Sequence, residues 1–276
     1  MSCRVFRPCL ALALLLSPCV SDAETQGVEE DAVPASARRV LAVAFDNLYE
    51  VNTISRLDLV IRDRSGQERR RTFHTVNKII DDRLHSIGRL IAPEYLRGMT
   101  VMVIEAGGQR HDAFVYLPSL GRVRRVTTAQ RGDAFLGSDL TYEDFERQYV
   151  DDYELGFVAP QSISGEPCHV VRGHPRRRFS YEHVDFFVAT SDAAILESRY
   201  YKRGADAPYR VIVSPRAFMT NGGGHVLPKR ILVRNLLRNT TTEVLIHEIA
   251  INPEIDDRLF SAVTLEQKGD LPLPGE

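Results

Sequence analysis

Apolar positions follow a helical spacing near the N-terminus and a spacing of two farther along the chain. The first apolar set recurs at three- and four-residue steps: Ala37, Leu41, Ala44 and Leu48. This spacing predicts an amphipathic helix that begins near Pro34 and ends by Asn52. From Leu57 onward, apolar and polar residues alternate in short segments, which predicts β-strands.

The predicted strands are short, and turns rich in Gly, Asn and Ser separate them. They cover residues 57–62, 69–78, 84–91, 99–105, 111–117, 122–127, 153–158, 168–173, 184–190, 195–202, 210–213, 226–234 and 242–251. Few helical windows interrupt them, and no linker or repeat divides the chain. This pattern predicts one mainly β (α+β) domain over residues 34–276, with a curved antiparallel sheet that forms a barrel or half-barrel.

Residues 142–153 depart from the strand pattern. The segment is rich in helix formers, and Phe145, Tyr149 and Val150 lie close to helical spacing. Thr141 is placed to cap it. We expect a short helix or an ordered loop that lies across the sheet, and both a lid over a barrel mouth and an ordinary connection fit the pattern.

The first 23 residues have the composition of a secretory signal peptide. Arg4 and Arg7 precede an apolar run at residues 9–16, and Ser21-Asp22-Ala23 forms a small-x-small cleavage site. The run is far shorter than the roughly 20 residues of a spanning helix. We therefore predict a cleavable signal at 1–23 and a flexible lead-in at 24–33.

Three of the four cysteines lie inside the predicted signal, so the mature chain keeps only Cys168. An exported protein with one cysteine has no internal disulfide, and its core alone must stabilise the fold. A lipid anchor at Cys19 is the less favoured alternative to cleavage after Ala23, because Pro18 fits a lipoprotein cleavage site poorly.

The charge balance excludes one broad class of partner. The chain carries 35 basic and 37 acidic residues, a net charge of −2. Removal of the signal takes away Arg4, Arg7 and Asp22 and leaves a net charge of about −3. A nucleic-acid-binding role is therefore not expected. No later apolar run is long enough to span a bilayer, which argues against an integral membrane protein.

A group of arginines is the first candidate for binding. Arg122, Arg124 and Arg125 lie on one predicted strand, just before a loop that contains Asp133, Asp139 and Asp144. Arg124 or Arg125 can pair with these acids and hold the loop over the sheet. Alternatively, the guanidinium groups can meet a lipid phosphate or carboxylate at a cavity rim.

A second basic run surrounds the turn at 173–175, at Arg172, Arg176, Arg177 and Arg178. We expect a solvated hairpin tip there, and contact with an anionic membrane or an acidic partner is the alternative.

Catalytic patterns are weak. His247-Glu248 lacks the second histidine of a zinc-protease helix. Cys168 and His169 point to opposite faces of a strand and cannot form a catalytic pair. An envelope hydrolase that uses His169 or His183 is the least favoured function. We expect no enzyme activity, no cofactor and no metal.

Several motifs together indicate a family. A strand that ends in Leu117-Pro118 is followed by the arginine group and by a loop with the motif residues Phe135, Gly137, Ser138, Asp139, Tyr142 and Asp144. This segment, 115–144, resembles the signature of the outer-membrane lipoprotein-sorting (LolA-like) family. Residues 46–49, 92–99, 165–168 and 252–260 extend the resemblance to nearly the whole mature chain. The absence of tryptophan, the loop after Lys202 and residues 219–224 depart from the family pattern.

The resemblance implies a half-open antiparallel barrel with an N-terminal helix and a helical or loop lid, whose apolar concave face shelters acyl chains. The candidate cavity residues are Leu57, Leu59, Ile61, Val101, Val103, Phe114, Tyr116, Phe186 and Val188. A one-residue slip inverts the face on which a strand residue lies, so the face assignment stays open.

The function that the resemblance implies is a periplasmic carrier or chaperone for lipids or lipoproteins. Its partners would be acyl chains, with an inner-membrane lipid exporter as a candidate and with only peripheral membrane contact. The alternative is an accessory module of an envelope complex, in which the protein's own side chains fill the half-barrel.

Overall fold

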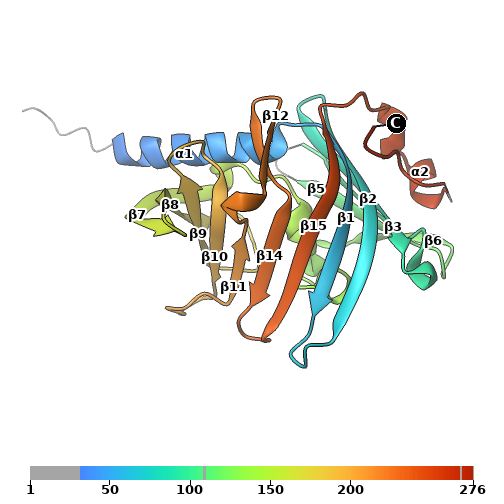
Figure 1. The fold of residues 1–276 in the computed structure, drawn as a ribbon, viewed down its shortest axis with the longest axis horizontal. Coiled ribbons are helices and arrows are strands. Elements are labelled where there is room, and N and C mark those ends of the chain that lie inside the picture. The colour runs from blue at the N-terminus through green and yellow to red at the C-terminus, as the bar shows by residue number, and fades with distance from the viewer. Residues whose placement is uncertain (1–31, 108–109, 268, 276) are drawn as a thin grey trace, which may run out of the picture. The chain divides into compact units, whose positions relative to one another are not determined.

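A single antiparallel sheet of 13 strands dominates the computed structural model, which describes residues 32–107, 110–267 and 269–275 (Figure 1). Its strand order is β6-β5-β4-β3-β2-β1-β15-β14-β11-β10-β9-β8-β7, and β12 pairs with β13 in a separate two-stranded sheet. The edge strands β6 and β7 do not pair with each other, so the sheet is curved but open. The predicted mainly β, half-open fold is confirmed. The predicted signal peptide lies outside the described residues.

The elements follow one another in short steps. The strands are β1 (Thr53–Arg62), β2 (Glu68–Ile80), β3 (Arg83–Ala92), β4 (Thr100–Glu105), β5 (His111–Leu117), β6 (Arg122–Val126), β7 (Tyr153–Ile163), β8 (Glu166–Pro175), β9 (His183–Ala189), β10 (Ile195–Tyr201), β11 (Arg210–Val213), β12 (Met219–Gly222), β13 (His225–Pro228), β14 (Arg230–Asn235) and β15 (Thr240–Ile251). The α-helices are α1 (Ala32–Tyr49) and α2 (Ala262–Glu266). The 3₁₀ turns are η1 (Glu94–Leu96), η2 (Thr128–Gln130), η3 (Phe135–Gly137), η4 (Tyr142–Phe145), η5 (Val150–Asp152), η6 (Arg216–Phe218) and η7 (Asp257–Phe260).

Two predicted elements differ in detail. The strand expected at 226–234 is two strands, β13 and β14, which are separated at Lys229. Pro228 ends β13, and it has no N–H to continue a ladder. The segment expected to be a helix or an ordered loop contains the turns η4 and η5. Thr141 caps η4, since its backbone N–H and its hydroxyl both donate to Asp144, at 2.7 and 2.9 Å.

Helix α1 packs on one end of the concave face, against β7–β9 (Figure 1). Ala37, Leu41 and Ala44 are fully buried, as their helical spacing predicted. The Phe45 ring meets the Phe186 ring edge-on, with centroids 5.6 Å apart. The last residues of the helix, Leu48 and Tyr49, lie on the concave face near side chains of β1–β4.

The opposite, convex face of β1–β5 is covered by the C-terminal segment. Ile54, Val76 and Met102 pack there against Phe260 and Leu265. Arg89, only 2% exposed, donates hydrogen bonds to the carbonyl oxygens of Thr264 and Gly269 and thereby ties this segment to β3. Different segments thus pack on the two faces of the sheet, and part of the concave face is left unfilled.

Candidate functional site

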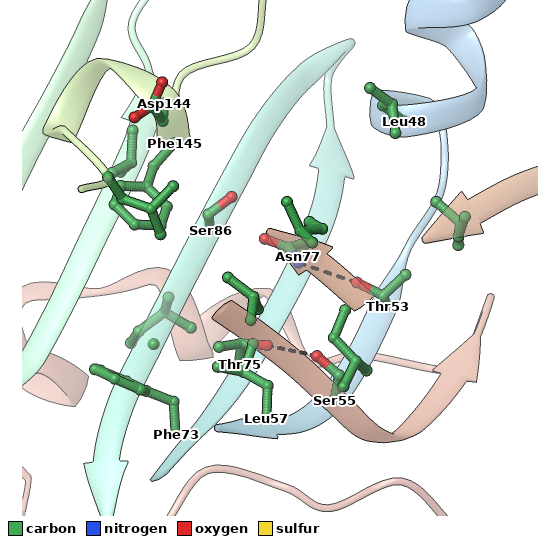
Figure 2. A pocket seen from close by; sticks show the side chains of 18 of the residues that line it. Leu48, Thr53, Ser55, Leu57, Phe73, Thr75, Asn77, Ser86, Asp144 and Phe145 are labelled. Carbon is green, nitrogen blue, oxygen red and sulfur yellow. Dashed lines mark hydrogen bonds between the residues drawn. The ribbon is translucent and has the colours of Figure 1, made fainter. Parts of the chain in front are cut away.

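A cavity of about 390 Å³ lies on the concave face. Strands β1–β4 and β13–β15, the end of α1 and the segment around η3 and η4 enclose it (Figure 2). Its apolar lining includes Leu48, Val51, Leu57, Leu59, Phe73, Leu84, Val101, Val103, Phe135, Leu140, Phe145, Leu227, Ile231, Val244, Ile246 and Ile249. Its size is in the range typical of ligand pockets.

The strand period explains the lining. Every second residue of β1 from Thr53 to Leu59 faces the cavity, and Phe73, Thr75 and Asn77 face it from β2. In the antiparallel register Thr53 lies opposite Asn77, and Leu57 lies opposite Phe73. Side chains at these positions form continuous rows across the sheet.

Residues 134–146, which we call the lid, close one side of the cavity. Its aromatic side chains pack together, with the Phe135 and Phe145 rings 4.8 Å apart and the Phe135 and Phe73 rings 6.1 Å apart. Leu136 and Gly137 have positive φ angles of 51° and 69°, which turn the chain sharply inside η3. The lid therefore presents an apolar underside to the sheet.

Polar contacts with the sheet hold the lid in place. The Arg71 guanidinium donates to the Leu136 carbonyl oxygen. Asp139 accepts hydrogen bonds from the hydroxyls of Thr240 and Thr242, and the Thr242 hydroxyl also accepts from the Asp139 N–H at 2.8 Å. Each of these contacts joins the lid to β2 or β15, so the sheet fixes the position of the lid.

The strongest of these contacts is a buried ion pair. Arg210 of β11 holds Asp144 in a two-pronged contact, with N···O distances of 2.7 and 2.9 Å. The Arg210 guanidinium also lies over the Tyr200 ring, 4.4 Å from its centre. Among the described residues that line the cavity, Asp144 is the one charged side chain, and Arg210 neutralises it.

A second buried cluster fixes the end of the lid. Glu146 pairs with both Arg131 and Arg177, and Arg177 also contacts Asp152 at 2.9 Å. The His111 Nε2 accepts the Arg147 N–H at 3.1 Å, so the proton of the neutral ring lies on Nδ1, 3.5 Å from Glu146. Burial and the nearby Arg177 and Arg131 lower the pKa of His111 to about 3. The histidine is therefore neutral at physiological pH.

The predicted cavity residues divide among three places. Leu57, Leu59, Val101 and Val103 line the cavity. Ile61 lies in the same core cluster, while Phe186 and Val188 lie under α1. Phe114 and Tyr116 pack on the convex face with the cluster that the C-terminal segment covers.

The predicted rim arginines lie on the edge strand β6, and the side chains of Arg122, Arg124 and Arg125 are exposed there. Arg125 pairs with Asp112, and the expected pairing of Arg124 or Arg125 with Asp139 or Asp144 is not found. Those two acids bind groups of β11 and β15 instead. Among the other motif residues, Phe135 lines the cavity, Tyr142 packs against the Phe135 ring, and the Ser138 hydroxyl donates to the Phe135 carbonyl oxygen.

Two arginines of the second basic run also form ion pairs within the fold, which the sequence did not indicate. Arg177 belongs to the buried cluster at the end of the lid, and Arg172 makes a two-pronged pair with Asp185 at 2.7 and 2.8 Å. The expectation of a solvated hairpin tip at 173–175 is therefore wrong, because these residues continue β8, with Gly173 opposite Leu155, and the two arginines are paired.

The sequence analysis missed two features of the site. Arg210 was not singled out, although a lone arginine at the start of an apolar strand is a signal for a buried pair. The polar residues Thr53, Ser55, Thr75, Asn77 and Ser86 were also missed. The first two continue the alternation of Leu57 and Leu59 backwards along β1, so an earlier strand start would have revealed them.

The lining offers little for catalysis. It contains no histidine, cysteine, lysine or arginine among the residues that the structure describes. In the same part of the chain no group of three or more His, Cys, Asp or Glu side chains is arranged to hold a metal ion. No helix within 32–107, 110–267 and 269–275 has the length and apolar character to cross a membrane.

Comparisons with solved structures give the same architecture. A DUF1329 family protein from Desulfovibrio piger has 21% sequence identity and a TM-score of 0.78, with 84% of this chain and 99% of that chain covered. A putative outer membrane lipoprotein-sorting protein domain from Vibrio parahaemolyticus has 16% identity and a TM-score of 0.76, with 84% and 100% covered. A LolA superfamily protein from Nitrosomonas europaea has 16% identity and a TM-score of 0.65, with 84% and 99% covered.

Comparisons based on the sequence alone give fewer matches. No curated protein matches the chain. A family model described as "Uncharacterized protein" matches residues 83–267, which is well over half of the chain. The chain therefore belongs to the family of this model, and the solved structures show that it has a LolA-like fold.

Proposed function

We propose that this protein is a carrier that binds the apolar part of a lipid or lipoprotein in the cavity of its half-open sheet. The observation that carries the proposal is the free volume of about 390 Å³ on the concave face, walled mainly by Leu, Val, Ile and Phe side chains. A protein whose own side chains fill its half-barrel would not keep such a space.

The energetics favour this role. Each methylene group removed from water contributes about 0.8 kcal/mol, so ten methylenes contribute about 8 kcal/mol before the costs of association. An acyl chain in the cavity therefore needs no covalent attachment to stay bound. Among the described residues the lining contains no histidine, cysteine or lysine, and its one carboxylate, Asp144, is paired with Arg210, which supports a binding function rather than turnover.

The place of work that we propose is the periplasm. The predicted signal peptide at 1–23 supports export, and the likeness to a lipoprotein-sorting domain and a LolA superfamily protein fits a role in lipid traffic. An inner-membrane lipid exporter is a suitable donor, since the cargo must be handed over without exposure to water.

The test is lipid binding by the purified protein. Lipid should co-purify from the native host, as detected by mass spectrometry, and 1-N-phenylnaphthylamine should fluoresce on binding and be displaced by lipid. Leu57→Trp fills the cavity and should weaken dye binding at least tenfold. Leu57 is chosen because it lines the cavity and is only half-buried, so the larger ring can be accommodated at low cost to folding.

The matched control is Leu237→Trp, the same substitution at a side chain that is 74% exposed. It should bind the dye as the parent protein does. Absence of both dye binding and co-purifying lipid in the parent protein would favour the accessory module with a filled half-barrel.

A further inference from the structure

The floor of the cavity is polar at one end and apolar at the other. Thr53 and Ser55 on β1, Thr75 and Asn77 on β2 and Ser86 on β3 gather at one end (Figure 2). We call these five residues the polar row. Farther along the same strands the positions become Leu57, Leu59 and Phe73. From Thr53 to Leu59 the floor extends roughly 20 Å, at about 3.3 Å per residue.

The polar row is arranged to bind hydrogen-bonding groups. The Ser55 and Thr75 hydroxyls lie 2.6 Å apart, and the Asn77 Nδ2 donates to the Thr53 hydroxyl at 3.0 Å (Figure 2). These bonds orient the side chains and leave capacity unused, because each hydroxyl has two acceptor lone pairs and Asn77 keeps its carbonyl oxygen. The Ser86 side chain lies opposite Asn77 in the register and is half-buried.

The surroundings disfavour a charged group at this end. No lysine or arginine side chain lines the cavity within the described residues, so an anion would lack a counter-ion. The C-terminus of the 18-residue α1, at Tyr49, borders the same space and carries a partial negative charge. A cation would gain only this partial charge, because the one lining carboxylate among the described residues, Asp144, is already neutralised by Arg210.

We propose that the cavity selects a single amphiphile with an uncharged, hydroxyl-bearing head, whose head hydrogen-bonds to the polar row and whose tail lies between Leu57, Phe73 and the lid. This inference rests on the proposed function and adds the class of cargo to it. The five polar side chains would have no use under a purely hydrocarbon ligand, since burying hydroxyls against methylenes is unfavourable.

The test compares three ligands with the same oleoyl-length chain at pH 8 and below their aggregation concentrations. Monoolein has an uncharged diol head, oleate is anionic and oleylamine is cationic. Each displaces 1-N-phenylnaphthylamine from the full chain. Monoolein should displace the dye at a concentration at least tenfold lower than either charged ligand, because only its head finds matching hydrogen-bond partners in the polar row.

Two substitutions of similar shape test the residues. Thr75→Val and Asn77→Leu should reduce the preference for monoolein over either charged ligand to less than threefold, with each displacement measured against the dye affinity of the same variant. Thr72→Val is the matched control: it lies on the same strand, faces the other side and hydrogen-bonds to Asp58 at 2.7 Å. It should keep the full preference.

The outcomes separate the two proposals. If the dye binds and all three ligands compete equally, or a charged ligand competes best, the inference about the head group is overturned and the carrier remains. An unchanged preference in Thr75→Val and Asn77→Leu also overturns it. If neither dye nor ligand binds, the carrier itself is overturned. The comparison of ligands on the parent protein needs no variant to fold.

Discussion

Arg210 keeps a positive charge at a site where only 1% of its surface is exposed. Its attraction to Asp144 raises its pKa far above the ordinary value, although burial acts in the opposite direction. The pair links β11 to the lid. The cost of burying the two charges is balanced by their mutual attraction, and therefore only while both partners are present.

Arg210→Met should therefore destabilise the fold by about 3–5 kcal/mol, because Asp144 would remain buried without a counter-ion. Urea unfolding followed by circular dichroism measures the change. Arg125→Met is the matched control, since the Arg125 side chain in its pair with Asp112 is 66% exposed. That substitution should cost no more than about 1 kcal/mol. Equal effects of the two substitutions would show that the buried pair does not hold the lid.

His111 makes stability depend on pH. The folded protein binds the proton of His111 only near pH 3, whereas the unfolded chain binds it near pH 6.5. Below pH 6.5 the unfolded state therefore binds more protons, and the free energy of unfolding falls by about 1.4 kcal/mol per pH unit. At pH 4.5 this loss amounts to roughly 3 kcal/mol.

Urea unfolding at pH 7 and pH 4.5 tests the role of His111. His111→Gln has no proton to gain, so it should lose about 3 kcal/mol less than the parent between these pH values. Identical losses in parent and variant would mean that another group causes the acid sensitivity.

At the scale of elements, the lid is an irregular segment that depends on its contacts with the sheet. Its only regular structure is η3, η4 and a single bridge between Ala134 and Thr141. Asp139 is the point where it meets β15, and both oxygens of its carboxylate accept hydroxyls there. Such a segment can open locally without unfolding of the sheet.

Thr242→Val should promote this local opening. The substitution keeps the shape of the side chain and removes the hydroxyl that bonds both the carboxylate and the N–H of Asp139. Leaving buried partners unsatisfied costs about 1–3 kcal/mol. Hydrogen exchange followed by mass spectrometry should become at least fivefold faster in residues 135–145 and stay unchanged in β1 and β2.

Thr241→Val is the control for this measurement, because Thr241 is the neighbouring position and points to the other face of β15. It should leave exchange in the lid as it is in the parent. Uniformly faster exchange across the sheet in Thr242→Val would instead assign the lid and sheet to one cooperative unit.

The alternation of apolar residues predicted the strands and the helix because both depend on local periodicity. The resemblance offered Leu57 and Val101 as cavity residues with the face left open, and both line the cavity. It could not place Phe114, whose face is set by pairing with Met102 across β4 and β5. The partner of Asp144 was equally hidden, since Arg210 lies 66 residues away along the chain. Partners brought together by the fold leave no periodic trace in the sequence.

At the scale of the whole molecule, one layer of strands separates two apolar spaces. On the concave side the cavity stays open beneath the lid and α1, and on the convex side Ile255, Phe260, Leu265 and Leu271 fill the surface. Arg89 fastens the second cover through backbone carbonyl oxygens. The C-terminal segment thus packs against the convex face of the strands whose concave face forms the floor of the cavity.

Because side chains on both faces of these strands pack against other segments, insertions and deletions within the strands are disfavoured. Adding one amino acid inside β2 would send Phe73, Thr75 and Asn77 outward and bring His74 and Val76 inward. We expect insertions and deletions where the pleat has ended, as at the hairpin tips 63–67 and 236–239. Related chains should accordingly vary in length at these tips and keep β1 to β4 free of gaps.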